Sequence, residues 1–153
     1  NMRYEINRKF VVQNKSSFMK GKDVSSNRDL IDIPSLKTTN LVRFTNKKWS
    51  NFSAEIQSEL VFRQRNFPNN NFEAYIPRTD SFILVDISSP PPAYHLLNVR
   101  SDFDLKISKK ENVRVAFSIN NLLNTAYRDY LNRFRYYADE MGRNFTLKLK
   151  MTF

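Results

Sequence analysis

The chain ends in the stretch RNFTLKLKMTF, residues 143–153, and this stretch decides the fold class. From Asn144 onward, apolar and polar side chains alternate without a break. The apolar set is Phe145, Leu147, Leu149, Met151 and Phe153, and the polar set is Asn144, Thr146, Lys148, Lys150 and Thr152. A period of two residues is typical of a β-strand with one apolar and one polar face. The sequence therefore predicts a strand over residues 144–153.

The same period recurs upstream and predicts five more strands. Three are regular and two, nearer the start, are less so; they cover residues 112–120, 98–107, 53–63, 36–46 and 2–13. Arg8 falls on the apolar face of the first strand and Asn40 on that of the second. The predicted fold class is all-β, with about six antiparallel strands.

Short and long connections alternate along this predicted sheet. Polar turns join strands at residues 46–50 and 108–112, whereas residues 14–35, 66–96 and 122–142 form long connections. Long structureless loops are uncommon in compact soluble domains. Outer-membrane barrels, in contrast, alternate short periplasmic turns with long external loops. The layout favours the wall of a transmembrane barrel over a soluble β-sandwich, which would show the same side-chain alternation.

Two consequences follow from a membrane location. Because the smallest membrane barrels have eight strands, six strands form only part of a barrel. An arginine on the lipid face at mid-depth would cost about 2–4 kcal/mol. We therefore expect Arg8 either near the membrane interface or turned inward by a bulge.

Composition excludes several classes of function. The chain has 2 Gly, 0 Cys and 1 His, too few for a glycine-rich phosphate loop, a thiolate metal site or a His-rich zinc site. Since no nucleophile–base constellation stands out, we expect no enzyme activity, no cofactor and no metal site.

The excess of positive charge could indicate nucleic-acid binding or contact with anionic lipid. Lys plus Arg number 25 against 15 Asp plus Glu, a net charge of +10. These cations spread over all strands and loops without forming one stripe, which argues against nucleic-acid binding. Part of the excess lies in two predicted turns, at Lys47-Lys48 and Lys109-Lys110, where it would meet anionic lipid headgroups.

Several stretches resemble a known family. They are Asn120–Tyr127 (NNLLNTAY), Tyr130–Arg133 (YLNR), Gly142–Phe145 (GRNF) and the final alternating strand. Together they resemble the C-terminal end of TonB-dependent outer-membrane receptors, over residues 98–153. Residues 90–98 (PPPAYHLLN) resemble a passage from loop to strand in the siderophore-type branch, while residues 2–66 agree only in layout. Met151 departs from the pattern, because the family usually has an aromatic residue there.

The resemblance implies a fold, a location and partners. The family forms a 22-stranded barrel around an N-terminal plug and imports ferric siderophores, haem, cobalamin or glycans with energy passed through TonB. Residues 1–153 would be the C-terminal part of such a barrel in the outer membrane of a Gram-negative cell. The plug domain and the TonB-binding segment would lie outside this chain. The implied partners are outer-membrane lipid, the rest of the barrel, the plug, TonB, the barrel-assembly machinery and an iron chelate or similar ligand.

The last long connection carries the main candidates for ligand binding. Arginine forks and aromatic faces suit anionic or aromatic ligands. The candidates are Tyr127, Arg128, Tyr130, Arg133, Arg135 and Tyr137, with Tyr136 beside them and His95 near another loop. A structural alternative remains open, because Tyr130, Phe134, Tyr137 and Met141 have the spacing of one face of a short helix ending at Gly142. A lone His95 is more often a hydrogen-bonded residue than a ligand.

Two further groups have expected roles. Leu149, Met151 and Phe153 resemble the terminal signal that the barrel-assembly machinery reads, and a free strand edge offers a chemical basis for such pairing. Charged residues on the polar face would look into the barrel, where they pair with each other or with a plug. These residues are Arg100, Asp102, Asp104, Arg114, Lys148 and Lys150.

The favoured function is therefore TonB-dependent import of a bulky nutrient, above all a ferric siderophore or similar iron chelate. A second hypothesis is a non-transporting scaffold or accessory subunit of an outer-membrane complex, with its loops as a protein-binding surface. The third and least favoured is a soluble β-sandwich binding module.

Overall fold

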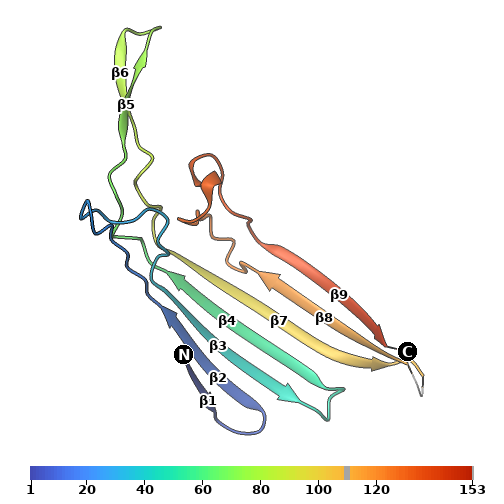
Figure 1. The fold of residues 1–153 in the computed structure, drawn as a ribbon. Coiled ribbons are helices and arrows are strands. Elements are labelled where there is room, and N and C mark those ends of the chain that lie inside the picture. Colours follow the sequence, from blue (N-terminus) through green and yellow to red (C-terminus); the bar gives the residue numbers. More distant parts are fainter. Residues whose placement is uncertain (109–110, 153) are drawn as a thin grey trace.

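The computed structural model describes residues 1–108 and 111–152, which form nine strands and one short 3₁₀ helix (Figure 1). In chain order these are β1 (Met2–Glu5), β2 (Phe10–Ser17), β3 (Lys37–Asn46), β4 (Phe52–Val61), β5 (Phe72–Ile76), β6 (Ser81–Val85), β7 (Tyr94–Lys106), β8 (Asn112–Asn120), η1 (Arg133–Tyr136) and β9 (Asn144–Thr152). No helix within these residues is long and apolar enough to cross a membrane.

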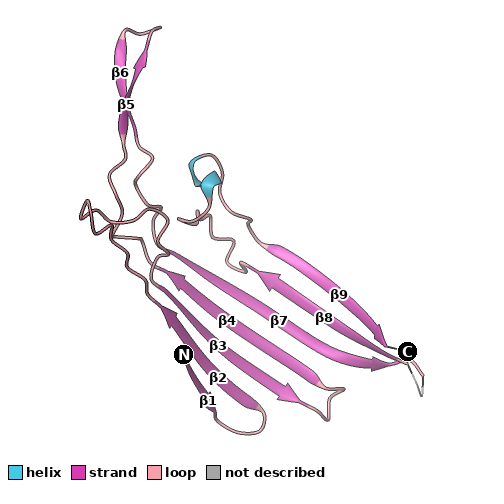
Figure 2. Ribbon diagram, viewed as in Figure 1, coloured by secondary structure: helices cyan, strands magenta, loops and turns pink. Residues whose placement is uncertain are grey.

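Seven strands form one antiparallel sheet. Their order is β1-β2-β3-β4-β7-β8-β9, and every neighbouring pair is antiparallel. The ribbon forms a single layer, and no second layer of the described residues covers either face (Figure 2). The predicted all-β, antiparallel fold class is confirmed, with one strand more in the sheet than the six predicted.

The extra strand arises near the start of the chain. The predicted strand over residues 2–13 is wrong, because β1 and β2 are separate and pair through a turn at residues 6–9. Asn7 makes this turn: its Oδ1 accepts hydrogen bonds from the backbone N–H of Lys9 at 2.8 Å and of Phe10 at 3.0 Å. Arg8 therefore lies in the turn, and the predicted cost of an arginine on a lipid face does not arise.

Asn40, the other polar residue predicted on an apolar face, does lie on that face. It is opposite Asn14 in the β2–β3 register. The Asn14 amide donates to Oδ1 of Asn40 at 2.7 Å. Each of these side chains thus has a hydrogen-bond partner on a face that is otherwise largely apolar.

The connection over residues 66–96 also differs from the prediction. It contains the hairpin β5–β6, which stands away from the sheet (Figure 1) and makes no contact with any other described strand. Within it, Tyr75 packs on Phe82 with ring centroids 5.3 Å apart and donates to Oδ1 of Asp80 at 2.8 Å. The run from Phe82 to Val85 has no period of two, because neither face of a projecting hairpin is covered by the sheet.

The sheet has two chemically different faces. In register across β3, β4 and β7 lie Arg43, Glu55 and Arg100, and one residue away lie Val42, Ile56 and Val99. The apolar face is open: on β9, Phe145 is 62% exposed and Leu147 64%. No described side chain is fully buried. The soluble-sandwich hypothesis requires a second layer over this face, and the described residues provide none.

Ion pairs bridge neighbouring strands on the polar face. Arg43 pairs with Glu55 at 2.5 Å, and Arg114 lies 3.2 Å from each of Asp102 and Asp104. The expected pairing of Arg114, Asp102 and Asp104 is therefore confirmed. Of the other candidates on this face, Arg100 and Lys148 line a hollow beside β8, and Lys150 lies opposite Arg114 in register.

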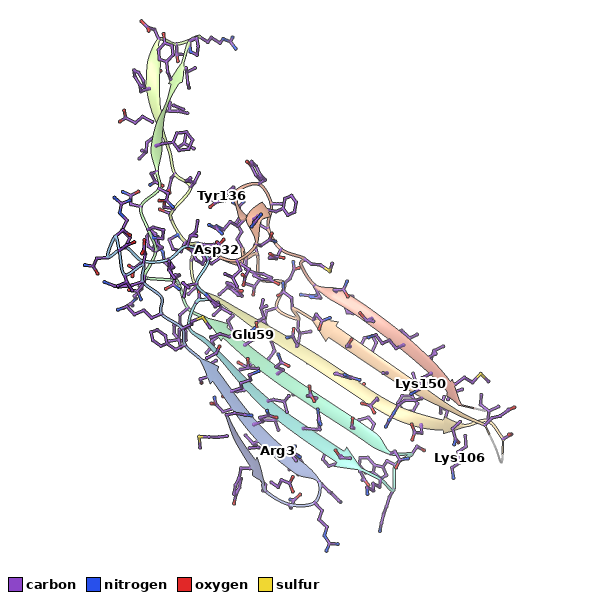
Figure 3. The ribbon with its side chains drawn as sticks, in the orientation of Figure 1. Arg3, Asp32, Glu59, Lys106, Tyr136 and Lys150 are labelled. Carbon is purple, nitrogen blue, oxygen red and sulfur yellow. The ribbon has the colours of Figure 1, made fainter. Side chains whose placement is uncertain are left out.

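The two ends of the sheet differ as predicted. Short turns lie at one end, and the three long connections gather beyond the other (Figure 1). In Figure 3, Glu59 and Lys150 lie along the sheet, whereas Asp32 and Tyr136 lie among the long connections. We call these two ends the turn end and the loop end.

Candidate functional site

The base of the last long connection is fixed by two asparagines of the NNLLNTAY stretch. Asn121 is 3% exposed and has a φ of 52°. Its side-chain amide accepts a hydrogen bond from the Thr125 backbone N–H and donates one to the Thr125 carbonyl, both at 2.9 Å. The backbone N–H of Asn121 donates to Oδ1 of Asn98 at 2.8 Å. Asparagine tolerates this left-handed backbone better than most residues. This part of the motif therefore closes the loop onto β7.

Asn124 joins the loop to the start of β9. Its φ is 54°, and its Oδ1 accepts from the backbone N–H of Arg143 at 2.9 Å. A Cβ atom at position 142 would lie 2.9 Å from the same oxygen, which explains the glycine there. In the sequence, the stretches NNLLNTAY and GRNF are notable only for a resemblance. In the structure, their residues fix the two ends of the last long connection.

Tyr127 packs against the first residue of β7. Its ring centroid lies 4.5 Å from that of Tyr94, and the Tyr94 hydroxyl donates to Oδ2 of Asp129 at 2.7 Å. Burial raises the pKa of the Tyr127 phenol, and burial likewise raises that of Tyr130. Both phenols therefore stay neutral at physiological pH.

Arg135 connects three separate segments at the loop end. It is 6% exposed, and its guanidinium lies 4.6 Å from the ring centroids of both Tyr130 and Tyr136. One nitrogen donates to the Tyr130 carbonyl, and Nη2 donates to the Tyr136 hydroxyl at 2.5 Å. The Tyr136 hydroxyl donates in turn to the Ile87 carbonyl at 2.6 Å, and Nη1 lies 3.8 Å from Asp32. This group, which we call the Arg135 clasp, holds the loops together.

Arg128 is also held by its own loop. Its Nε donates to Oδ1 of Asp139 at 2.6 Å, and its Nη1 donates to the Arg135 carbonyl at 2.9 Å. A hollow of about 470 Å³ lies beside it. The walls of this hollow are Asp86, Ser89, Pro91, Pro92, Ala126, Tyr127, Arg128, Arg135, Tyr136 and Asp139. Since two carboxylates share this space with the two arginines, the hollow is not a purely cationic site.

The predicted helix face is wrong. Only Arg133–Tyr136 is helical, capped by Oδ1 of Asn132, which accepts from the Phe134 N–H at 2.9 Å. Phe134 is 71% exposed and Tyr137 83%, so these side chains do not form a packed face with buried Tyr130. The reason is that Arg135, between them, turns inward to the clasp. Arg133, Phe134 and Tyr137 therefore form an exposed tip, which we call the loop tip.

His95 does not join the other candidates. It lies in β7, and its Nε2 is 2.9 Å from the Ser58 hydroxyl on β4. It is not part of the wall of the hollow. No group of three or more His, Cys, Asp or Glu within the described residues is placed to hold a metal ion.

The proposed assembly signal is described only in part. Leu149 and Met151 lie on the apolar face of β9, and both are exposed. Phe153 lies outside the described residues, as do Lys109 and Lys110. The outer edge of β9 pairs with no other described strand.

Comparison with known proteins finds similar solved structures, and these likenesses concern the fold. No family model and no curated protein matches the chain. A solved structure described as the copper transporter OprC is similar with a TM-score of 0.73 at 16% sequence identity. The likeness covers 96% of this chain and 21% of that one, so the chain spans about a fifth of that transporter's length. The sheet and its loops are thus similar in fold to part of that structure, in agreement with the predicted fold class.

Proposed function

We propose that residues 1–153 are the C-terminal part of an outer-membrane barrel that imports a bulky nutrient in a TonB-dependent manner. The observation that carries this proposal is the single-layer sheet, with one uncovered apolar face and one charged face, folded like part of a transporter. Burial of apolar surface is the dominant favourable term in folding, so a face this large requires a cover. Lipid tails provide that cover in a membrane barrel.

The sheet edges support a larger assembly. Within the described residues, β1 and β9 each pair on one side only. An open edge inside a membrane leaves backbone groups unsatisfied at several kcal/mol each. Since seven strands are fewer than the eight of the smallest membrane barrels, further strands would close this one. A plug inside the barrel, TonB and the barrel-assembly machinery complete the proposed set of partners.

The loop tip favours an anionic, aromatic cargo. Arg128 and Arg135 are held by other groups of the loops, whereas the side chains of Arg133, Phe134 and Tyr137 are exposed. A guanidinium beside aromatic faces suits carboxylate or catecholate groups, as in ferric siderophores. We therefore propose an iron chelate as cargo and Arg133 and Tyr137 as its first contacts. Copper is the competing cargo, because one similar solved structure is described as a copper transporter.

An uptake assay tests this proposal. Cells that express the intact protein are supplied with radioactive ferric chelates or copper, with and without functional TonB. We expect uptake of an iron chelate that requires TonB and falls at least tenfold in an Arg133→Ala, Tyr137→Ala double variant. Arg28→Ala, which removes an exposed arginine from another loop, should leave uptake unchanged. TonB-dependent uptake of copper alone would replace the iron chelate as cargo.

A second candidate function, a non-transporting scaffold, is favoured by the β5–β6 hairpin. Phe82 and Leu84 are exposed, and an isolated two-stranded hairpin is only marginally stable in water. Such a surface suits contact with another protein. If the correctly inserted protein transports none of the supplied cargoes, the scaffold role becomes the better account.

A further inference from the structure

Two short turns lie side by side at the turn end. They are residues 6–9, between β1 and β2, and residues 47–51, between β3 and β4. The Thr45 N–H donates to the Lys9 carbonyl at 2.8 Å, and Phe10 lies opposite Phe44 in register. On the other side, the Asp104 N–H donates to the Ser50 carbonyl at 2.7 Å. These contacts fix both turns relative to the sheet.

Four aromatic rings cluster at this end of the apolar face, three from the strands and Trp49 from the second turn. The centroid distances are 4.9 Å for Phe10–Phe44, 6.1 Å for Phe44–Trp49 and 6.4 Å for Trp49–Phe52. Phe44 is two residues from Val42 along β3, so this cluster continues the apolar face toward the turns. Trp49 is 63% exposed. Tryptophan rings of this kind are enriched at the headgroup level of membranes.

Two cationic residues adjoin this aromatic cluster along the chain. Arg8 lies two residues before Phe10, and Lys48 directly precedes Trp49. Neither side chain belongs to any ion pair of the described residues, unlike Arg43 and Arg114 on the polar face. Lys47 differs from Lys48, because it lines a second hollow of the polar face, near the turn end, together with Arg43 and Asn51.

We propose that the two turns bind the headgroup phosphate of an anionic phospholipid, with Arg8 and Lys48 as its contacts and Trp49 beside the glycerol region. This inference rests on the proposed membrane location of the sheet. The three parts of such a lipid match the order of groups along the surface: acyl chains against the apolar face, glycerol beside the aromatic cluster, and phosphate at the cations. The charge of the site is complementary to an anionic headgroup.

Quenching of Trp49 fluorescence by brominated lipids tests the inference. The intact protein is reconstituted into vesicles that contain brominated phosphatidylglycerol or brominated phosphatidylcholine. The Trp49 signal is obtained by subtracting the spectrum of a Trp49→Phe variant. We expect at least twofold stronger quenching by phosphatidylglycerol, and this preference should decrease at high salt because exposed charges are screened.

Variants separate a local site from net charge. The preference should disappear in an Arg8→Gln, Lys48→Gln variant and persist in Lys47→Gln, which also removes one positive charge from the same turn. Equal quenching by both lipids, or loss of the preference in Lys47→Gln, would overturn the inference and leave the proposed membrane location intact. Absence of quenching by either lipid would contradict the membrane location itself.

Discussion

At the scale of single residues, asparagine has two different uses in this chain. Asn7 closes a turn through its side-chain oxygen, whereas Asn121 and Asn124 also adopt positive φ values. Asn121 has a φ of 52°, and its backbone N–H donates to Oδ1 of Asn98 on β7 at 2.8 Å. Its side chain hydrogen-bonds within the last loop, to the Thr125 backbone at 2.9 Å and to the Met141 carbonyl at 3.4 Å. Its replacement should therefore affect the loop end more than the sheet.

Asn121→Ala should destabilise the protein by about 2 kcal/mol, since three side-chain hydrogen bonds are lost and alanine resists a positive φ. Asn121→Gly loses the same side-chain hydrogen bonds without the backbone strain, so it should be less destabilising. Urea unfolding of the reconstituted intact protein measures both. Equal losses for the two variants would show that backbone strain has no part in the effect.

Arg135 should be intolerant even of lysine. The planar Arg135 guanidinium donates to the Tyr130 carbonyl and to the Tyr136 hydroxyl at the same time. A lysine ammonium cannot reproduce this fork of donors. Arg135→Lys should therefore release the clasp and speed amide hydrogen exchange over residues 127–142 by at least tenfold. Arg133→Lys, at the exposed loop tip, provides the matched control and should leave exchange unchanged. Similar exchange in both variants would contradict the clasp.

Asp23 gives a pH-dependent prediction. Hydrogen bonds from the Ser25 and Ser26 hydroxyls and from the Ser25 N–H lower its pKa from 3.8 to about 2. Because the folded pKa lies below the unfolded one, this stabilisation of the loop is complete above pH 3.8 and is lost as the pH falls toward 2.

Carbon-13 carboxyl titration of the folded protein checks this value. Ser25→Ala should raise the Asp23 pKa, since it removes the largest cause of the lowering. Ser89→Ala, near Asp86 in another loop, should leave the Asp23 pKa unchanged. A normal Asp23 pKa in the unmodified protein would refute the described turn.

At the scale of elements, strands with alternating apolar and polar residues could be predicted from the sequence. Elements without this alternation could not. β9 was predicted from sequence because each side chain belongs to one face of the sheet. The hairpin β5–β6 was missed because it has no covered face, and the break between β1 and β2 was missed because it depends on the side chain of Asn7. The helix face was predicted wrongly, since spacing alone could not reveal that Arg135 turns inward toward Tyr130, Asp32 and Tyr136.

The independence of the hairpin can be tested by deletion. Because β5 and β6 contact no other described strand, replacing residues 72–85 by a short Gly-Ser linker should change the free energy of unfolding by less than about 1 kcal/mol. Heat-modifiable migration of the intact protein reports the folded barrel. Loss of folding would mean that the hairpin packs on parts of the protein outside this chain. Normal folding with impaired uptake would assign the hairpin a functional role.

At the scale of the whole molecule, one chemical division organises the chain. Apolar side chains lie on one face of the sheet, paired charges lie on the other, short cationic turns lie at one end and long loops lie at the opposite end. The sequence predicted this division and the alternation of turns and loops. It could not predict the contacts among loops, because the Arg135 clasp joins residues from three connections that are far apart in the chain.

The most direct test is an accessibility scan of β9 in the intact, reconstituted protein. Residues 1–153 have 0 Cys, so single cysteines introduced at positions 145–150 of a protein without other cysteines can each carry a spin label. We expect labels at 145, 147 and 149 to be relaxed by lipid-soluble oxygen, and labels at 146, 148 and 150 by a water-soluble nickel chelate. If the labels at 145, 147 and 149 were shielded from both reagents, as beneath a second protein layer, the account would be contradicted.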